Sequence, residues 1–226
     1  MEIRRLHLLE GARQATGTAV IIDVFRAFTT AAFVMANGAE RIIPVAGIDE
    51  AFRLRELHPS WIIMGEQHGE PIPGFDYGNS PADVEHIDFT DRTVVQRTSS
   101  GTQGIILARD ADEVLLGSFV IAEATANYLR LRKSDTVSLV SMGWEGRYDA
   151  IEDELCAEYI EARIRGEKPD FEEMRARIRA SSQGAKFFDP RQSHFKERDF
   201  HLAMSLDRFG YALKVVRDDL PFLARA

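Results

Sequence analysis

Short runs of apolar, mostly β-branched residues recur along the chain, and stretches of helical length and composition separate them. Six runs predict strands: Thr18–Val24, Arg41–Val45, Trp61–Gly65, Thr93–Thr98, Glu113–Leu116 and Thr136–Met142. Four stretches between them predict helices: Ala27–Ala36, Ile48–Leu57, Gly101–Ala108 and Phe119–Leu131. Such alternation is typical of βαβ units, so we expect an α/β fold with a mostly parallel or mixed sheet flanked by helices.

Helical patterns dominate the chain after Met142. Ala150–Gly166 predicts one helix, Asp170 starts another, and Leu213–Val216 predicts a last strand. No clear linker or internal repeat divides the 226 residues, which are enough for one large domain. We therefore expect a single α/β domain over residues 1–226, with residues 148–212 as the candidate for a helical C-terminal subdomain.

Composition narrows the class of protein. Apolar residues make up 45% of the chain and charged residues 28%, which is typical of a globular protein. No segment approaches the roughly 18 uncharged apolar residues that a membrane helix needs. Charges interrupt the N-terminal run MEIRRLHLLEGARQ, unlike the apolar core of a signal peptide. We expect a cytoplasmic protein that does not contact the membrane.

The formal charge of −8 disfavours nucleic acid as a partner, because binding to a phosphate backbone needs a basic surface. A small anionic ligand would have to meet a local cation, either an arginine or a metal ion. The single cysteine, Cys156, excludes an internal disulfide. Its place on the apolar side of a predicted helix indicates a packed thiol rather than a nucleophile.

Charged side chains follow the first predicted strand. Asp23 lies where this strand ends, and Arg26 precedes the next helix. Ligands of parallel α/β sheets bind beyond the carboxyl ends of the strands. Asp23 would ligate a hard cation or attack phosphorus, Arg26 would hold an anion through two hydrogen bonds, and Thr29 would cap the helix or reach that anion. The alternative is structural, with Asp23 capping the helix and pairing with Arg26.

A second carboxylate, Glu66, follows the third predicted strand and leads into the long loop Gln67–Pro81. Long loops in compact domains are often functional. Within this loop Asp76, Asn79 and Ser80 provide oxygen ligands of the kind that Mg²⁺ binds. The same residues are equally typical of a turn.

A hydroxyl-rich turn joins the fourth predicted strand to its helix and contains Thr98, Ser99, Ser100, Gly101 and Thr102. Backbone N–H groups at a helix start, with hydroxyls and a glycine, form an anion cradle without a charged side chain. The Gly-Lys-Ser/Thr ending of a Walker P-loop is missing, which disfavours ATP hydrolysis. The alternative is a turn that only caps its helix.

The sixth predicted strand leads into the turn Gly143–Arg147, and Glu152 and Asp153 begin the next helix. Acids in a first helical turn are favourable there, but this acidic run exceeds what capping needs. They point in different directions on a helix, so at most one or two would face a common metal. The histidines form no HxH or HExxH pattern, and only His68, close to Glu66 in the loop, stands out.

Four sequence blocks, VIIDVFRAFTTA, GEQHGEPIPGFDYGNSP, RTSSGTQGI and GWEGRYDAIEDELCAEYI, occur in this order between about residues 18 and 160. Together they resemble the signature blocks of the 2-phosphosulfolactate phosphatase family. The resemblance implies an α/β fold of the family's own type and Mg²⁺-dependent hydrolysis of (R)-2-phospho-3-sulfolactate to 3-sulfolactate and phosphate. In organisms that make coenzyme M, this step belongs to its biosynthesis. A homodimer is the expected assembly.

The residues and the resemblance together assign three kinds of role. The catalytic residues would be Asp23, Arg26 and Asp153. The metal ligands would come from Asp23, Glu66, Asp76, Glu152 and Asp153. The substrate would contact Thr29, Asn79, Ser80, Thr98, Ser99, Ser100, Gly101, Thr102 and Arg147. Whether Asp23 attacks phosphorus or holds the metal that activates water stays open.

The chain departs from the family pattern near the expected pocket. Ser100 stands where asparagine is usual, Phe25 and Phe28 replace smaller residues, and Glu158 replaces glycine. Two other functions therefore stay open: a phosphatase for a related phosphorylated 2-hydroxy acid, and an anion-binding protein without turnover. A nucleotide-dependent transferase is disfavoured because the chain has neither a Walker nor a GxGxxG motif.

Overall fold

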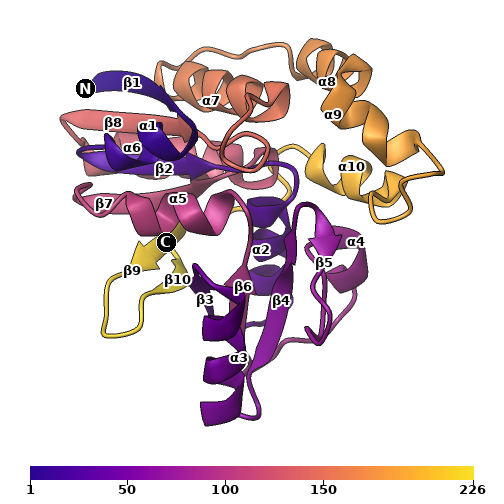
Figure 1. Cartoon of the computed structure of the whole chain (residues 1–226). Helices are drawn as coiled ribbons and strands as arrows, with labels where there is room; N and C mark the ends of the chain where they lie inside the picture. The colour runs from indigo at the N-terminus through magenta and orange to yellow at the C-terminus, as the bar shows by residue number, and fades with distance from the viewer.

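The computed structural model describes residues 1–226 and contains one ten-stranded sheet with helices on both faces (Figure 1). The strands are β1 (Glu2–His7), β2 (Thr18–Ile22), β3 (Arg41–Val45), β4 (Ile62–Gln67), β5 (Glu70–Pro71), β6 (Thr93–Arg97), β7 (Glu113–Gly117), β8 (Thr136–Ser141), β9 (Leu213–Val216) and β10 (Phe222–Arg225). The α-helices are α1 (Leu8–Arg13), α2 (Ala27–Ala36), α3 (Ile48–Leu57), α4 (Pro81–Val84), α5 (Gly101–Leu107), α6 (Ala122–Arg132), α7 (Ile151–Ile164), α8 (Phe171–Ala180), α9 (Ser182–Ala185) and α10 (Glu197–Ala203). Two 3₁₀ turns complete the chain, η1 (Phe119–Ile121) and η2 (Lys186–Phe188). The expected α/β fold with a mostly parallel sheet is confirmed.

The sheet consists of two parallel halves that a hairpin joins. Its strand order is β1-β8-β2-β7-β9-β10-β3-β6-β4-β5. The pairs within β1-β8-β2-β7 and within β3-β6-β4 are parallel. The β9–β10 hairpin lies between the halves and pairs antiparallel with β7 on one side and β3 on the other. The strands of one half therefore point in the opposite direction to the strands of the other half.

The carboxyl ends of both halves nevertheless meet near the centre of the molecule. In Figure 1 the strands β3, β4 and β6 cross the strands β2, β7 and β8 at a steep angle, because the sheet twists strongly at the hairpin. The loops after β2 and β8 thus approach the ends of β4 and β6. This meeting point forms the pocket described below.

Each half buries both of its faces, as strands in parallel sheets generally do. All five residues of β2 are buried, and they alternate between two core clusters. Ala19 and Ile21 face the side that α1, α2 and α5 cover, while Val20 and Ile22 face α6 and α7. In the other half, Ile43 and Ile63 pack against α3.

Helix α2 lies between the two halves and is buried from Ala27 to Met35. A helix that is apolar all round needs partners on every side, and α2 packs against α4, α5, η1 and β3. Its N-terminus begins directly after Arg26. The helix therefore fixes the segment Asp23–Arg26 against both halves of the sheet.

Sequence patterns predicted the central elements closely. The bounds of α2, α3, β3 and β9 are those expected, and β2, β4, β6, β7, β8, α5 and α7 differ by a few terminal residues. The expected helix Phe119–Leu131 begins instead with the 3₁₀ turn η1 before α6. Edge strand β1 was missed because its charged residues hide the strand pattern, and β10 was missed because it has only four residues.

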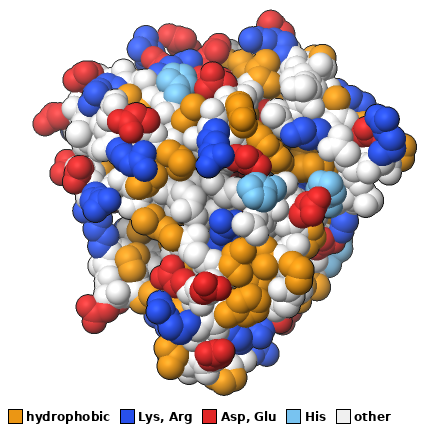
Figure 2. All heavy atoms as spheres, viewed as in Figure 1, with side chains coloured by type: hydrophobic (Ala, Val, Ile, Leu, Met, Phe, Trp, Pro, Cys, Tyr) orange, Lys and Arg blue, Asp and Glu red, His pale blue; other side chains and the backbone are white.

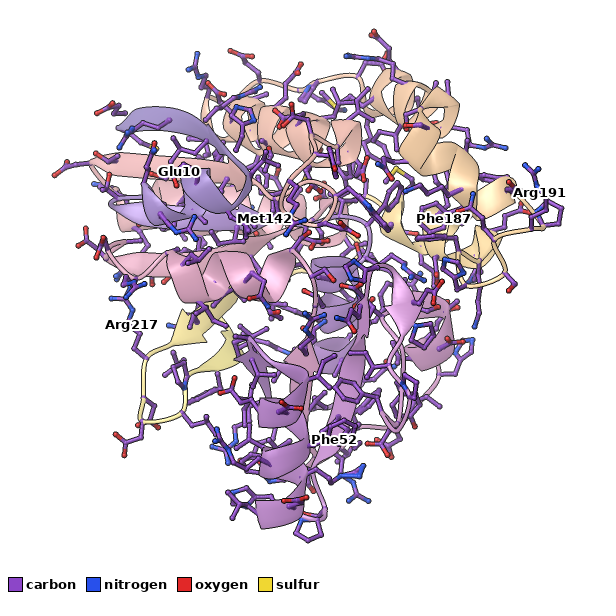
Figure 3. The ribbon with its side chains drawn as sticks, viewed as in Figure 1. Glu10, Phe52, Met142, Phe187, Arg191 and Arg217 are labelled. Atoms are coloured by element: carbon purple, nitrogen blue, oxygen red, sulfur yellow. The ribbon has the colours of Figure 1, made fainter.

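The C-terminal third packs on the sheet and on the pocket wall. Helix α7 carries Cys156, whose free thiol is buried in the second core cluster, as expected for a packed cysteine. Figure 3 shows Phe187 on the side of the molecule formed by α9 and α10. Its ring centroid lies 4.6 Å from that of Phe25, which follows β2, and 5.5 Å from that of Phe195. This aromatic cluster joins the last helices to the first strand–helix turn.

The face of the protein shown in Figure 2 has no basic patch, in keeping with the net charge of −8. On the face shown in Figure 2, basic side chains are scattered among acidic and apolar ones rather than gathered in one patch. None of the helices is both long enough and apolar enough to cross a membrane.

Candidate active site

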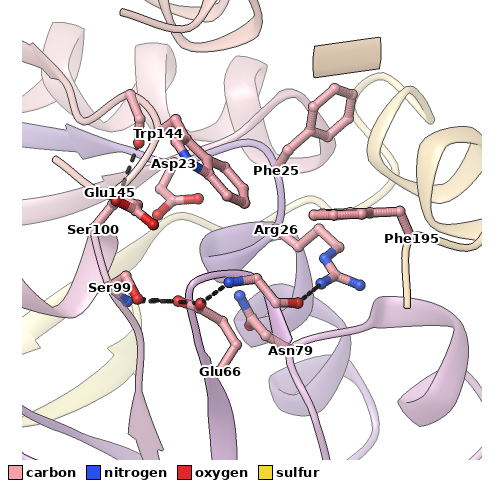
Figure 4. Close-up of a pocket in the computed structure, with 12 residues that line it drawn as sticks. Asp23, Phe25, Arg26, Glu66, Asn79, Ser99, Ser100, Trp144, Glu145 and Phe195 are labelled. Atoms are coloured by element: carbon pink, nitrogen blue, oxygen red, sulfur yellow. Dashed lines mark hydrogen bonds between the residues drawn. The ribbon is translucent and has the colours of Figure 1, made fainter. Parts of the chain in front are cut away.

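A pocket opens where the carboxyl ends of the two halves meet (Figure 4). It holds about 350 Å³ of space free of protein atoms, part of it open to solvent. Its walls come from the loops after β2 and β8, the ends of β4 and β6, and the C-terminal third. The lining residues are Asp23, Phe25, Arg26, Glu66, Gly69, Asn79, Ser99, Ser100, Gly143, Trp144, Glu145 and Phe195.

Asp23 lies at the pocket floor, one residue after β2. Its Oδ1 accepts a hydrogen bond of 3.1 Å from Ala27 N–H at the start of α2. The pKa of Asp23 is raised to about 7, mainly by burial and in part by the charge of Glu66, whereas the N–H groups of Ala27 and Gly101 oppose the rise. A Cβ atom at Gly101 would lie 2.9 Å from Asp23 Oδ2, so only glycine lets α5 begin this close to the carboxylate.

Arg26 is held by protein groups on several sides. Its Nη1 donates to Asp199 Oδ2 and to the His194 carbonyl, both at 2.8 Å, and its Nη2 donates to the Gly69 carbonyl at 2.9 Å. The guanidinium also lies 4.9 Å from the centroid of the Phe195 ring. Arg26 and Asp199 form an ion pair with side chains 5% and 0% exposed. The charge of Arg26 is therefore already offset within the protein.

Glu66 ties the end of β4 to the hydroxyl-rich turn. Its Oε1 accepts from Ser99 N–H at 2.5 Å, and its Oε2 accepts from Gly69 N–H at 2.6 Å and from Ser99 Oγ at 3.2 Å. Figure 4 shows this carboxylate between Ser99 and Asn79 on one wall of the pocket. Three hydrogen bonds therefore hold the Glu66 carboxylate in place.

Within the hydroxyl-rich turn, the residues divide into two groups. Thr98 and Thr102 are buried, and each side chain accepts a hydrogen bond from the backbone N–H of the other, at 3.0 and 2.9 Å. Their hydroxyls thus hold the start of α5 and lie outside the pocket lining. Ser99 and Ser100 line the pocket, and Ser100 Oγ donates to the Gly143 carbonyl at 2.9 Å.

Two acids of α7 lie behind Asp23. Asp153 accepts from Val24 N–H and from Gly143 N–H, both at 2.8 Å, and so joins the loops after β2 and β8. Burial raises the pKa of Asp153 well above its usual range, and the charges of Asp23 and Glu152 add to the rise. Burial also raises the pKa of Glu152 to about 7, and its Oε2 has no hydrogen-bond partner.

Several residues expected at the site lie elsewhere. Thr29 Oγ1 donates to the Val24 carbonyl at 2.8 Å inside the turn, and Ser80 Oγ donates to Asp199 Oδ1 at 2.6 Å. The structure does not bring Asp76 into the pocket, because its carboxylate pairs with Arg55 and accepts from Ile63 N–H. Arg147 is exposed and also lies outside the lining.

Sequence reasoning missed Asp199, Gly69, Phe195 and Lys186. Asp199 is a single acid close to the apolar residues of HLAM, in a segment for which the sequence predicted no helix or strand. The sequence also did not predict that His68 Nδ1 lies 2.7 Å from Oε1 of Glu145, a lining residue. A separate cluster of His7, Asp149 and Glu154, with ligand atoms within 4.8 Å of one another, lies on the surface outside the pocket lining.

Comparisons with known proteins agree on one family. A sequence model of the 2-phosphosulpholactate phosphatase family matches residues 5–209. A probable 2-phosphosulfolactate phosphatase of Bacillus subtilis (strain 168) is 32% identical over 210 residues, which cover 91% of this chain and 90% of that protein. A protein of the same name from Carboxydothermus hydrogenoformans is 34% identical over 220 residues, which cover 95% of this chain and 87% of that protein. Another from Caldicellulosiruptor saccharolyticus is 40% identical over 146 residues, which cover 63% of this chain and 60% of that protein.

The fold, the pocket and these relatives define a phosphoric monoester hydrolase. The chain belongs to the 2-phosphosulpholactate phosphatase family. The resemblance found in the four sequence blocks is thereby confirmed.

Proposed function

We propose that this protein is a Mg²⁺-dependent phosphatase that hydrolyses 2-phospho-3-sulfolactate to 3-sulfolactate and phosphate, a reaction of the coenzyme M biosynthesis type. Membership of the family supports the substrate, and relatives that align over most of their length carry its name. The observation that carries the metal dependence is the buried acidic group around Asp23, in which Glu152 Oε2 has no partner.

A divalent cation fits these acids. Asp23, Glu152 and Asp153 are all buried, and the charge of Asp23 raises the pKa of the other two. Carboxylates at such close quarters stay ionised only when positive charge offsets their repulsion. Carboxylate oxygens are the ligands that Mg²⁺ prefers. Asp23 and Glu66 would hold the ion from the pocket lining. Glu152 lies outside the lining and would have to turn its unpartnered oxygen toward the ion, because the three carboxylates do not all lie within 4.8 Å of one another. Asp76, paired with Arg55, is left out of this set.

When bound, Mg²⁺ supplies positive charge against the phosphoryl oxygens. The chain's own groups position the ester. The side-chain amide of Asn79 lies in the lining and would donate to a phosphate oxygen. Ser99 and Ser100 also lie there, but their hydroxyls donate to Glu66 and to the Gly143 carbonyl and would have to turn toward the phosphate. The rings of Trp144 and Phe195 form the apolar part of the pocket wall.

In this proposal Asp23 holds the metal rather than attacking phosphorus. Its carboxylate accepts from the N–H groups of Ala27 and Gly101, which hold its oxygens in place for a metal. The proposal therefore predicts direct attack by water and no covalent phosphoryl enzyme.

The test is phosphate release from purified protein with 2-phospho-3-sulfolactate, phospholactate and phosphoglycolate, first with Mg²⁺ and then with a chelator. Wild type should release phosphate only with the metal and fastest from 2-phospho-3-sulfolactate. Asp23→Asn should lose at least about 100-fold in rate, because it removes a charged ligand, while Asp110→Asn, an exposed aspartate, should match wild type.

Three outcomes would change the proposal. Metal-independent release would remove Mg²⁺ from it, and preference for phospholactate would keep the chemistry but replace the substrate. No release from any ester would leave an anion-binding protein. We also expect the protein to be a cytoplasmic homodimer. Light scattering on the purified protein measures its mass in solution and so tests the dimer.

A further inference from the structure

Lys186 lies beside the pocket, at the first residue of η2. Its Nζ lies 3.7 Å from the ring centroid of Trp144 and 5.5 Å from that of Phe195, and both rings line the pocket. The side chain is half-buried, and no hydrogen bond or ion pair joins its ammonium to another residue. Lys186 therefore places an unpaired positive charge against the aromatic wall.

The other cations near the pocket are already occupied. Arg26 is paired with the buried carboxylate of Asp199. Arg97, like Lys186, is not a lining residue, and its guanidinium donates to the carbonyls of Ala46 and Glu66 and to Ser99 Oγ. Hydrogen bonds thus hold both guanidinium groups in place, whereas none holds the Lys186 ammonium.

The lining itself is acidic, with the carboxylates of Asp23, Glu66 and Glu145. A metal held by the first two would offset the phosphate of a substrate. A second anionic group on the same substrate would then meet net negative charge, unless a cation lies at the other wall of the pocket. The aromatic wall under Lys186 is the place where the structure provides that cation.

We propose that Lys186 binds the second anionic group, a sulfonate or carboxylate, of the phosphate ester and thereby selects substrates that carry one. The inference rests on the proposed function for the phosphate end of the substrate. An ammonium over aromatic faces is partly removed from water, which strengthens its attraction for an anion. Burial lowers the pKa of Lys186, while the charges of Glu152 and Glu145 raise it.

The test measures binding of 3-sulfolactate, which has no phosphate, by calorimetry on the full-length protein with Mg²⁺ present. Lys186→Met keeps the length and apolar stem of the side chain, and Lys186→Arg keeps the charge. Lys168→Met, at an exposed lysine of the loop before α8, is the matched control. Loss of one charge-assisted contact predicts a Kd about tenfold higher for Lys186→Met, and wild-type-like values for the other two variants.

Steady-state kinetics provide the second readout. With 2-phospho-3-sulfolactate, Lys186→Met should raise KM about tenfold and change kcat less than about twofold, since the residue acts in binding. Hydrolysis of isopropyl phosphate, which has no second anionic group, should stay at the wild-type level. Near-ultraviolet circular dichroism and the melting temperature check that Lys186→Met remains folded.

Each result decides between the two proposals. A Kd for 3-sulfolactate within about twofold of wild type in Lys186→Met, or no binding of 3-sulfolactate to wild type, overturns the role of Lys186. A loss confined to kcat also overturns it. If wild type binds 3-sulfolactate through Lys186 but hydrolyses no ester, the proposed function fails and the binding site stands.

Discussion

Arg26 Nη1 donates a hydrogen bond of 2.8 Å to Asp199 Oδ2, although 173 positions separate the two residues in the chain. The second oxygen of Asp199 accepts from Ser80 Oγ at 2.6 Å and from Ala82 N–H at 3.0 Å. One fully buried carboxylate thus joins α10 to the turn after β2 and to the start of α4. The pocket wall formed by Arg26 depends on this contact with the C-terminal third.

Asp199→Ala should destabilise the protein by about 3 kcal/mol, because removing one partner leaves the buried charge of Arg26 uncompensated. Asp199→Asn should cost less, since its amide oxygen still accepts from Ser80. Urea unfolding measures both values. Glu197→Ala, an exposed acid of the same helix, should change stability by less than about 0.5 kcal/mol. Equal losses for Glu197 and Asp199 would contradict the special role of the buried pair.

Gly101→Ala should reduce phosphatase activity at least about tenfold, since misplacement of catalytic groups costs rate steeply. The added Cβ would lie 2.9 Å from Asp23 Oδ2 and from the side chains of Ala27 and Phe28, so Asp23 or the start of α2 has to move. Gly210→Ala is the matched control, because a Cβ there meets nothing within 4 Å. Measurement of kcat/KM for both variants checks this, and full activity of Gly101→Ala would show that the contact is not tight.

Glu152→Gln should weaken Mg²⁺ binding about tenfold or more, because it removes a carboxylate from the metal's surroundings. The metal-free variant should be more stable than wild type, since it no longer buries an unpartnered charge next to Asp23. Thermal unfolding across a Mg²⁺ titration reports both effects. Glu158→Gln, at an exposed position of the same helix, should leave Mg²⁺ affinity unchanged. A Mg²⁺ titration that does not distinguish Glu152→Gln from wild type would remove Glu152 from the metal site.

The ion pair of Glu85 with Arg198 predicts how the stability of the protein changes with pH. Its hydrogen bond with Arg198 lowers the pKa of Glu85 below the usual 4.5, with burial opposing and the charges of Arg198 and Arg208 assisting. A lowered folded-state pKa gives stability that is present above the unfolded pKa and lost as pH falls through the folded one. Glu85→Gln should therefore cost about 1 kcal/mol at pH 7, where the pair is bidentate.

The difference between Glu85→Gln and wild type should shrink as pH falls below about 4.5, where the carboxylate of the unfolded chain is protonated. Urea unfolding at pH 7 and at successively lower pH measures it. Glu56→Gln, at an exposed position without an ion pair, should match wild type throughout. A constant difference at all pH values would show that Glu85 acts through packing rather than through charge.

The sequence predicted the central elements because their patterns are local. Strand β2 is apolar throughout and α2 begins directly after Arg26, so both could be predicted from a few neighbouring residues. The positions of Asp23, Glu66 and Ser99 followed from the rule that strand ends gather ligands. The rule succeeded even though the two halves of the sheet run in opposite senses, because the twist at the hairpin brings their ends together.

The remainder of the site depends on contacts that no local pattern encodes. Phe195 reaches the pocket and Asp199 reaches Arg26 from a segment of short helices without clear periodicity, and only tertiary packing places them. Asp76 belongs to a loop whose composition suits a metal site, but the loop folds back so that Asp76 accepts from Ile63 N–H and pairs with Arg55. The carboxylate of Asp76, of a type that can bind a metal, therefore stabilises the loop in this structure.

The β9–β10 hairpin also bears on how the chain is made. Its strands, between Leu213 and Arg225, are the only ones whose pairing joins the two halves of the sheet. During synthesis on the ribosome, strands β1 to β8 emerge before this link exists. The halves can collapse separately by then, but their relative orientation is fixed only after the hairpin has left the exit tunnel. Residues remote from the chemistry therefore decide when a newly made molecule becomes able to bind its ligand.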